Sequence, residues 1–338
     1  MIAICDETPL RDKTLILDDT IEKKTGKEME LVSYHFDHTT QKSVLGYQLS
    51  STGIPLDAGF HVSKSRPNTK AKTIDKRSIG WRKEALTKKT VVAVDMLRRA
   101  WNKGIAASFV LFDSWYAHDV LIADILEIGY GVICRLKSNK VKYSYEGRHC
   151  TLKQLWQNVA KKKAKNIHGF PYKGICLKAT LPKSGKIAIL FISDEKKQSL
   201  CTDTELEPSE ILTYYARRWA IELFFKDGKQ MLYLGKEQSE TFEAVVASYS
   251  LVMIRYLLLV FILRKYHRTV PLGPLFRELQ ETHAQLIIME TMWGYIKDIL
   301  ILSSHLLLGE IEPDRFLHFL DIVEDAILMQ AKGATAKL

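Results

Sequence analysis

The first part of the chain alternates short apolar runs with polar turns. Residues 14–17 (TLIL) form an apolar run that ends at Asp18, and the runs at 29–37 and 43–51 are rich in Val, Tyr, Leu and Phe. Runs of this length and composition are typical of strands. The pattern predicts one strand that ends at the acid, then two antiparallel strands. The polar and basic stretch from about 54 to 80 predicts a solvated loop.

The next segments predict a strand–helix–strand unit. Apolar residues recur at helical spacing over residues 81–103, and residues 106–113 (AASFVLFD) form a continuous apolar run that ends at Asp113. Such a run suits a buried strand of the parallel type. A helix over 118–128 and a strand over 130–137 follow. This alternation of strands and helices is typical of an α/β fold.

The character of the sequence changes after the second of these strands. Residues 140–200 hold short β-like pieces with the basic cluster KKKAK at 161–165 between them, which predicts an inserted, mostly β subdomain. Pro208 suits the first position of a helix, where its missing N–H costs nothing. The chain from there to about Gln330 has the pattern of a helical region. We therefore expect four parts: 1–138 and 206–265 of one catalytic domain, the insertion 139–205, and the helical region 266–338.

One apolar segment raises the question of a membrane span. Residues 244–263 are about as long as a bilayer is thick. Arg255 lies near the middle, and a central arginine costs about 2.5–3.5 kcal/mol on the insertion scale. A helix in the core of a large soluble protein explains the segment better, although a membrane protein is the alternative that solubility without detergent would exclude. The first residues lack the pattern of a signal peptide.

Composition and charge narrow the classes of function. The 338 residues are 46% hydrophobic and 26% charged, which predicts a sizeable packed core. The net charge of +10 favours a polyanionic partner, above all nucleic acid. The five cysteines are scattered and contain no CxxC pair, so neither a zinc nor a disulfide framework is indicated. Reduced thiols fit a cytoplasmic protein.

The stretch YYARRWAIELFFKDGKQ (214–230) combines charged residues with many aromatic and apolar ones. In one continuous helix each residue advances about 100°, so Tyr215, Arg218, Glu222 and Lys229 would lie within an arc of about 60°. One interpretation is a surface ladder, because an i,i+4 pair such as Arg218–Glu222 is worth about 0.2–0.5 kcal/mol. The other is an acid that binds metal between cations that bind phosphate.

The second interpretation needs further acids from other segments. Asp18 and Asp113 each follow an apolar run, and acids at strand ends can meet at the edge of a sheet. Magnesium sites use few carboxylates, and two metals can stabilise both the attacking and the leaving oxygen of a phosphodiester. The alternative for each aspartate is an ordinary strand-end or helix-capping residue.

These residues together resemble the DDE transposases of the insertion sequence 4 family. The signature of that family is Tyr, two residues, Arg, three residues, Glu, six residues, Lys, and every spacing matches at Tyr215, Arg218, Glu222 and Lys229. The block LILDDT is similar to the motif of the first acid and indicates Asp18, with Asp19 as the alternative. The block VLFDSWYAHDVL is similar to that of the second and indicates Asp113. The resemblance covers about residues 12–265.

The resemblance implies a fold, a chemistry and a set of partners. The fold is ribonuclease-H-like: a mixed sheet flanked by helices, with a β-rich insertion before the glutamate. Asp18, Asp113 and Glu222 would hold two Mg²⁺ or Mn²⁺ ions, which support DNA cleavage at transposon ends and strand transfer. Tyr215, Arg218 and Lys229 would contact phosphates of double-stranded DNA, aided by the basic segments 64–77 and 161–165. A homodimer on DNA, acting on the nucleoid in the cytoplasm of a bacterial or archaeal cell, is also implied.

One departure from the family keeps alternatives open. A helical DNA-binding domain usually precedes the first aspartate in this family, whereas here only 17 residues do, so we expect a chain truncated at its amino end. A catalytically inactive remnant would bind DNA in a salt-sensitive way without metal-dependent chemistry. A ribonuclease-H-like nuclease would cut DNA without joining it.

Overall fold

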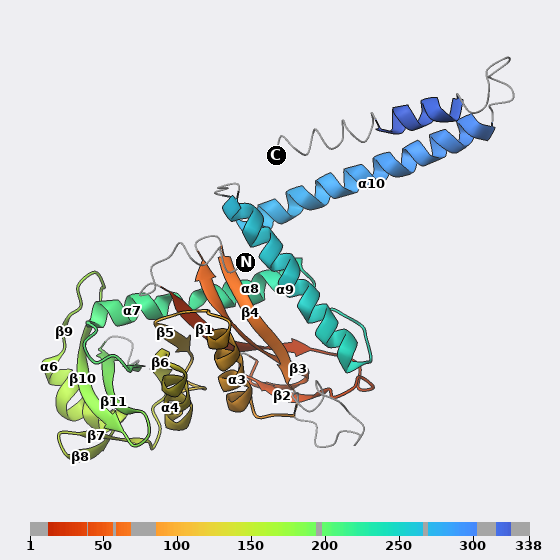
Figure 1. Ribbon diagram of the computed structural model, residues 1–338. Helices are drawn as coiled ribbons and strands as arrows, with labels where there is room; N and C mark the ends of the chain where they lie inside the picture. The colour runs from red at the N-terminus through yellow and green to blue at the C-terminus, as the bar shows by residue number, and fades with distance from the viewer. Residues whose placement is uncertain are drawn as a thin grey trace. The chain divides into compact units, whose positions relative to one another are not determined.

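The computed structural model describes most of the chain and divides it into two compact units (Figure 1). The described residues are 13–38, 40–56, 59–68, 86–193, 198–265, 270–302 and 316–325. The units are Met1–Arg268 and Thr269–Leu338. In the second unit, Lys297 of helix α10 (Leu272–Leu302) binds Asp321 and Glu324, which joins α10 to the helical segment 316–325.

The described part of the first unit is built on one mixed sheet of twelve strands. The order is β2-β3-β1-β5-β6-β12-β11-β10-β7-β8, with β4 beside β3 and β9 beside β10. The pairs β1–β5 and β5–β6 are parallel, and the other pairs are antiparallel. The bounds are β1 (Thr14–Lys23), β2 (Ser33–Asp37), β3 (Lys42–Leu56), β4 (Gly59–Asn68), β5 (Phe109–Phe112), β6 (Gly131–Leu136), β7 (Lys142–Tyr145), β8 (Arg148–Thr151), β9 (Lys165–Asn166), β10 (Lys173–Leu181), β11 (Gly185–Ile192) and β12 (Gln198–Cys201).

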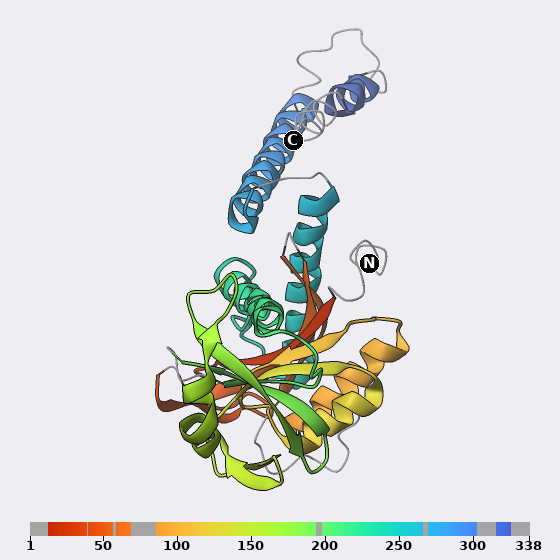
Figure 2. The ribbon, with the colours of Figure 1, turned by 90° about the vertical axis from the view of Figure 1, so that its left-hand side faces the viewer.

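Helices cover both faces of this sheet. Helices α3 and α4 lie on one face, and α7 and α8 lie on the other (Figure 2). This arrangement confirms the predicted α/β fold with a mixed sheet flanked by helices. The bounds in the first unit are α3 (Lys89–Asn102), α4 (Asp119–Ile128), α5 (Leu152–Leu155), the π-helical turn η2 (Trp156–Ala160), α6 (Lys161–Lys163), α7 (Pro208–Ala216), α8 (Trp219–Met231) and α9 (Phe242–Lys265).

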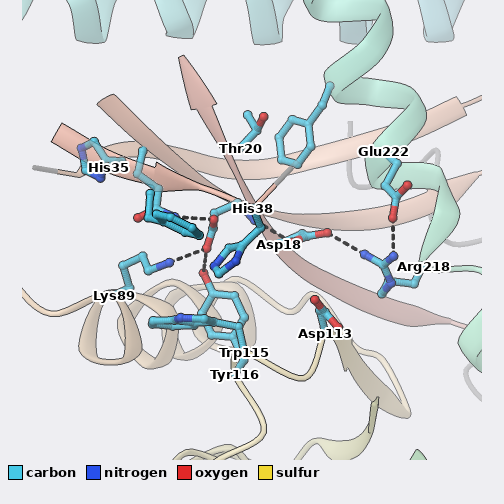
Figure 3. Close-up of a pocket in the computed structure, with 14 residues that line it drawn as sticks. Asp18, Thr20, His35, His38, Lys89, Asp113, Trp115, Tyr116, Arg218 and Glu222 are labelled. Atoms are coloured by element: carbon cyan, nitrogen blue, oxygen red, sulfur yellow. Dashed lines mark hydrogen bonds and ion pairs between the residues drawn. The ribbon is translucent and has the colours of Figure 1, made fainter. Parts of the chain in front are cut away.

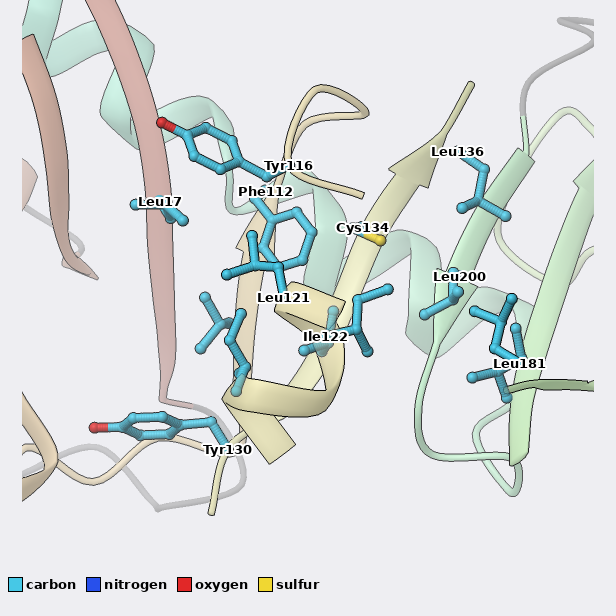
Figure 4. Close-up of a cluster of buried hydrophobic side chains, with 14 of the residues drawn as sticks. Leu17, Phe112, Tyr116, Leu121, Ile122, Tyr130, Cys134, Leu136, Leu181 and Leu200 are labelled. Carbon is cyan, nitrogen blue, oxygen red and sulfur yellow. The ribbon is translucent and has the colours of Figure 1, made fainter. Parts of the chain in front are cut away.

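The parallel strands are buried on both faces, as their continuous apolar runs predict. Leu15 and Leu17 of β1 join Phe112 of β5 and Leu121 of α4 in one buried cluster, part of which Figure 4 shows. Side chains alternate along a strand, so Ile16, which is also fully buried, points to the other face. The two sides of β1 therefore meet different helix layers.

The predicted end of the first strand at Asp18 is wrong. Strand β1 does not end at Asp18 but continues to Lys23. Its parallel neighbour β5 ends at Phe112, opposite Leu17, so from Asp18 onward β1 pairs only with β3. The acid lies inside a strand, at the place where the neighbouring strand stops.

Other predicted elements need correction too. The solvated loop expected over 54–80 is wrong in its first part, where β3 reaches Leu56 and β4 pairs with it; residues 69–80 lie outside the described residues. The helix expected over 81–103 begins only at Lys89, and residues 81–85 are likewise outside them. Strands β8 and β12 and the helical segment 152–163 were not predicted. The strands of the expected insertion extend the same sheet, because β12 pairs with β6.

The single helix predicted from Pro208 is also wrong. Two helices, α7 and α8, meet at a tight turn in which Arg217 and Arg218 donate backbone hydrogen bonds to Tyr214 and Tyr215. These bonds span three residues instead of four, which winds the backbone more tightly than an α-helix. The spacing of about 100° per residue therefore does not hold across Arg218.

Helix α9 is the segment that raised the question of a membrane span. It is the one helix among the described residues that is long and apolar enough to cross a bilayer, and a third of its most apolar window is buried. The helix is buried on one face only, because Leu251, Ile254, Leu258 and Phe261 are exposed. Its buried residues, among them Tyr249, recur every three or four positions, as in a helix that packs one face on a core.

Gly46 provides a test of the contact between β1 and β3. A Cβ atom at this position would lie 2.0 Å from the carbonyl oxygen of Glu22. We expect Gly46→Ala to push the strands apart and to lower the free energy of unfolding by about 3 kcal/mol or more. Gly26→Ala is the control, since its nearest neighbour would be Met29 at 3.6 Å. Urea denaturation of both variants measures the difference, and equal effects would contradict the close approach.

Candidate active site

Two of the predicted acids come together through strand register. Leu17 of β1 pairs with Phe112 of β5 in the parallel part of the sheet. The next residue on each strand is Asp18 and Asp113, so the two acids emerge side by side where β5 ends. Both line a cavity of about 580 Å³, which Figure 3 shows.

The third acid reaches the same cavity from helix α8. Glu222 lies one turn after Arg218, and both line the cavity. Arg218 Nη1 donates to Asp18 Oδ2 at 2.6 Å, while Nη2 donates to Glu222 Oε1 (Figure 3). The side chain of Arg218 is only 17% exposed. The i,i+4 pair is therefore part of a cavity wall, and the interpretation as a surface ladder is wrong.

The electrostatics of the cavity show a shortage of positive charge. Burial raises the pKa of Asp18 to about 7; Arg218 lowers it, and the charges of Asp19 and Asp113 raise it. The guanidinium of Arg218 thus offsets only part of the cost of burying these carboxylates. An added cation at this place would be stabilised by the same charges.

Asp19 faces the opposite side of β1 and has different partners. Its Oδ1 accepts from Gln48 of β3 at 2.6 Å, and its Oδ2 accepts from Lys89 of α3 at 2.8 Å and from the Tyr116 hydroxyl at 2.7 Å. Both oxygens are thus engaged by three donors. Because Tyr116 lies three residues after Asp113, this bond also ties the segment after β5 to β1.

The donor set suits a hard divalent cation. Carboxylate oxygens are the side-chain ligands that Mg²⁺ and Mn²⁺ prefer, and three such groups from β1, the end of β5 and α8 line one cavity. Within the described ranges no group of three or more Asp, Glu, His and Cys side chains lies close enough together to hold an ion as the side chains stand. Arg218 bridges two of the three acids.

The other two residues of the predicted stripe lie outside the cavity lining. The ammonium of Lys229 donates to Thr20 Oγ1 at 2.7 Å and to the carbonyl of Ile21 at 3.2 Å. Tyr215 lies in α7, its ring centroid 5.9 Å from the guanidinium carbon of Arg218, and burial raises its pKa to about 12. Arg218 and Lys229 therefore both face β1.

Several residues of the cavity were not predicted from the sequence: His35, Phe36, His38, Gln48, Lys89, Trp115 and Tyr116. Trp115 and Tyr116 directly follow Asp113, which was a usable signal. The Lys89 ammonium lies 3.6 Å from the Trp115 ring centroid and also donates to Asp19. No local sequence pattern distinguishes this lysine from the others.

The predicted basic segment 64–77 is described only in part, whereas the segment 161–165 is described in full. Residues 64–68 of the segment 64–77 form part of β4, and residues 69–77 lie outside the described residues. Lys161, Lys162, Lys163 and Lys165 of the other segment are exposed, so their ammonium groups can meet an anionic partner.

The sequence also matches models of two known protein families. A family model described as a transposase DDE domain matches residues 85–258, slightly more than half of the chain. A second, described as a DDE superfamily endonuclease, matches residues 2–153. No curated protein matches the sequence. The first match includes Asp113 and Glu222, and the second includes Asp18 and Asp113.

The bond between Tyr116 and Asp19 can be tested by removing one hydroxyl group. A hydrogen bond to a charged group is worth about 1.5–3 kcal/mol, and one between neutral groups about 0.5–1.5 kcal/mol. We expect Tyr116→Phe to lower the free energy of unfolding more than Tyr130→Phe, whose buried hydroxyl donates to the carbonyl of Ile105. Urea denaturation compares the two variants. An equal or smaller loss for Tyr116→Phe would show that this bond does not stabilise the acid segments.

Proposed function

The chain belongs to the transposase DDE-domain family, and we propose that it is a DNA transposase of the insertion sequence 4 type that cuts transposon ends and joins them to target DNA. One observation carries the proposal. Carboxylates from β1, from the end of β5 and from α8 surround one cavity, where an arginine of the family signature bridges two of them.

Asp18, Asp113 and Glu222 are the groups that would hold two Mg²⁺ or Mn²⁺ ions. Such ions, when bound, lower the pKa of a water molecule and offset the charge on a phosphodiester. The protein contributes fixed positions for the three acids: Asp18 and Asp113 by strand register, and Glu222 by its helix. Engagement of Asp19 by three donors favours Asp18 over Asp19 as the first ligand.

The cations around this cavity suit the phosphates of double-stranded DNA. Arginine presents a planar fork of donors that matches phosphate geometry, and Arg218 lies in the cavity wall. Lys229 and Tyr215 flank it on α8 and α7, and the exposed lysines of the 161–165 segment add charge at a distance. Because counterions are released on binding, DNA affinity should fall steeply with salt concentration.

The proposed reaction has two steps, and in each step one P–O bond replaces another. In cleavage a water oxygen bonds to phosphorus and the 3′ oxygen of the transposon strand leaves and takes a proton. In strand transfer that 3′-hydroxyl attacks a target phosphodiester, forms one P–O bond, breaks another and releases a target 3′-hydroxyl. One phosphodiester replaces another, so no external energy source is needed. Two ends must meet, so we propose a homodimer on DNA, acting on the nucleoid in the cytoplasm.

Glu222→Gln tests the role of the third acid. It keeps the shape of the side chain but removes the charge that would hold a metal ion, so we expect Mn²⁺-dependent cleavage of DNA carrying the sequences that flank the gene to fall at least about 100-fold. Asp227→Asn on the same helix is the matched control and should retain cleavage. Gel analysis of end-labelled DNA measures both rates. Cleavage by Glu222→Gln at the wild-type rate would remove this residue from the proposed site.

A joining assay separates a transposase from a nuclease. With pre-cut end DNA, Mn²⁺ and a supercoiled target plasmid, we expect covalently joined products that require the 3′-hydroxyl of the end DNA. End DNA with a 2′,3′-dideoxy terminus is the control and should give none, because the attacking oxygen is missing. Cleavage without any joined product would support a nuclease in place of a transposase.

A further inference from the structure

Strand β1 carries a buried carboxylate that the proposed chemistry does not use. Glu22 is 3% exposed and lies four residues after Asp18, so both side chains point to the α8 side of the sheet. It does not line the cavity. A charged group buried at such a place is costly unless it has a partner.

That partner is Lys229, a residue of the proposed DNA contact. The Lys229 ammonium lies 3.3 Å from Glu22 Oε1, in addition to its bonds to Thr20 and Ile21. Glu22 Oε1 itself accepts no hydrogen bond, so the contact with Lys229 is an ion pair without a well-directed hydrogen bond. An ammonium has three N–H groups. Two of these donate to Thr20 and Ile21 of β1, which leaves the third for another acceptor.

The carboxylate is fixed by its surroundings. Gly235, with φ of +77°, packs so closely that a Cβ atom there would lie 2.1 Å from Glu22 Oε2. The neighbouring buried pair is Lys24 with Glu237, at 2.6 Å. The charged and titratable groups that act on Glu22 are thus Lys229 of α8, Lys24 just after β1, Glu237 after α8 and Tyr249 of α9.

We propose that Glu22 is a positioning residue that holds the ammonium of Lys229 beside Thr20, where it meets a DNA phosphate next to Asp18. This inference rests on the proposed transposase function. Thr20, to which the Lys229 ammonium donates, lines the cavity, and the Lys229 side chain is 38% exposed.

Positioning matters here because lysine is flexible. Its long side chain loses rotamer freedom when it is fixed in one position. A rigid buried charge selects one rotamer before DNA arrives, so less freedom is lost on binding. The competing explanation is that Lys229 only neutralises Glu22 and stabilises the fold. The two explanations differ in whether Glu22 acts on DNA through Lys229.

The first experiment is acetylation of lysines followed by mass spectrometry, which needs no catalytic activity. In the wild-type protein we expect Lys229 to react several-fold more slowly than Lys226, an exposed lysine on the same helix, and bound DNA to slow Lys229 further. Glu22→Gln should speed the reaction of Lys229 and weaken its protection by DNA, whereas Glu240→Gln, at an exposed position between α8 and α9, should leave both unchanged. Equal rates for Lys229 in the wild type and in Glu22→Gln would overturn the proposal.

The second experiment is a double-mutant cycle on single-turnover DNA cleavage at pH 8.5. We expect Glu22→Gln to slow cleavage roughly tenfold through loss of position, with little change in DNA affinity because Lys229 keeps its charge. In a Lys229→Met background the same change should have no further effect. A Glu22→Gln effect of equal size in both backgrounds would show a purely structural role.

The pH dependence gives a third readout. Burial raises the pKa of Glu22 to about 7, although Lys229 and Lys24 oppose the shift and Glu237 adds to it. Glu22 is therefore charged above pH 7 and neutral below it, so the ratio of wild-type to Glu22→Gln cleavage should fall towards 1 as the pH drops to 6. A ratio that is constant with pH would contradict the role of the charge. If the wild-type protein did not cut DNA, the transposase proposal would fail, while the acetylation experiment would still decide the role of Glu22.

Discussion

The two-residue alternation of strand β1 is the constraint on which the rest of the site depends. Asp18 points to the side of α8, where Arg218 binds it, and Asp19 points to the side of α3, where Lys89 binds it. Because the period of a strand is two, a slip of one residue in the register between β1 and β3 would exchange the two sides. Both acids line the cavity, but Asp18 is bound by Arg218 of α8, whereas Asp19 is held by three donors from β3, α3 and the segment after β5.

Unequal strand lengths open the space that this alternation uses. Strand β5 ends at Phe112, opposite Leu17, whereas β1 continues to Lys23. A full-length β5 would pair with β1 beyond Asp18 and cover the flank of that strand. Instead the chain turns after Asp113, and Tyr116 returns to bind Asp19. The residues from Phe112 to Tyr116 thus end strand β5, place Asp113 at the cavity and bind Asp19.

Much of the fold was predictable, because apolar periodicity and strand-type runs are local signals. The run that ends at Asp113 and the helix start at Pro208 are examples. The features that could not be predicted correctly depend on tertiary contacts. The sequence does not show which face of β1 meets α8, so Asp18 and Asp19 could not be separated. The tight turn at Arg218 breaks the regular helical angle, and the bond of Arg218 to Asp18 joins residues 200 positions apart.

Apolar side chains attach helix α8 to the sheet beside its charged residues. Ile221, Phe224 and Phe225 of this helix are buried, and full burial of such side chains stabilises by about 1.5–3 kcal/mol each. The pairs made by Arg218 and Lys229 lie beside this apolar stripe, and a buried ion pair adds little net stability over an apolar one. The apolar residues therefore hold the helix against the sheet. The position of Glu222 therefore depends on this apolar contact more than on the ion pairs of Arg218 and Lys229.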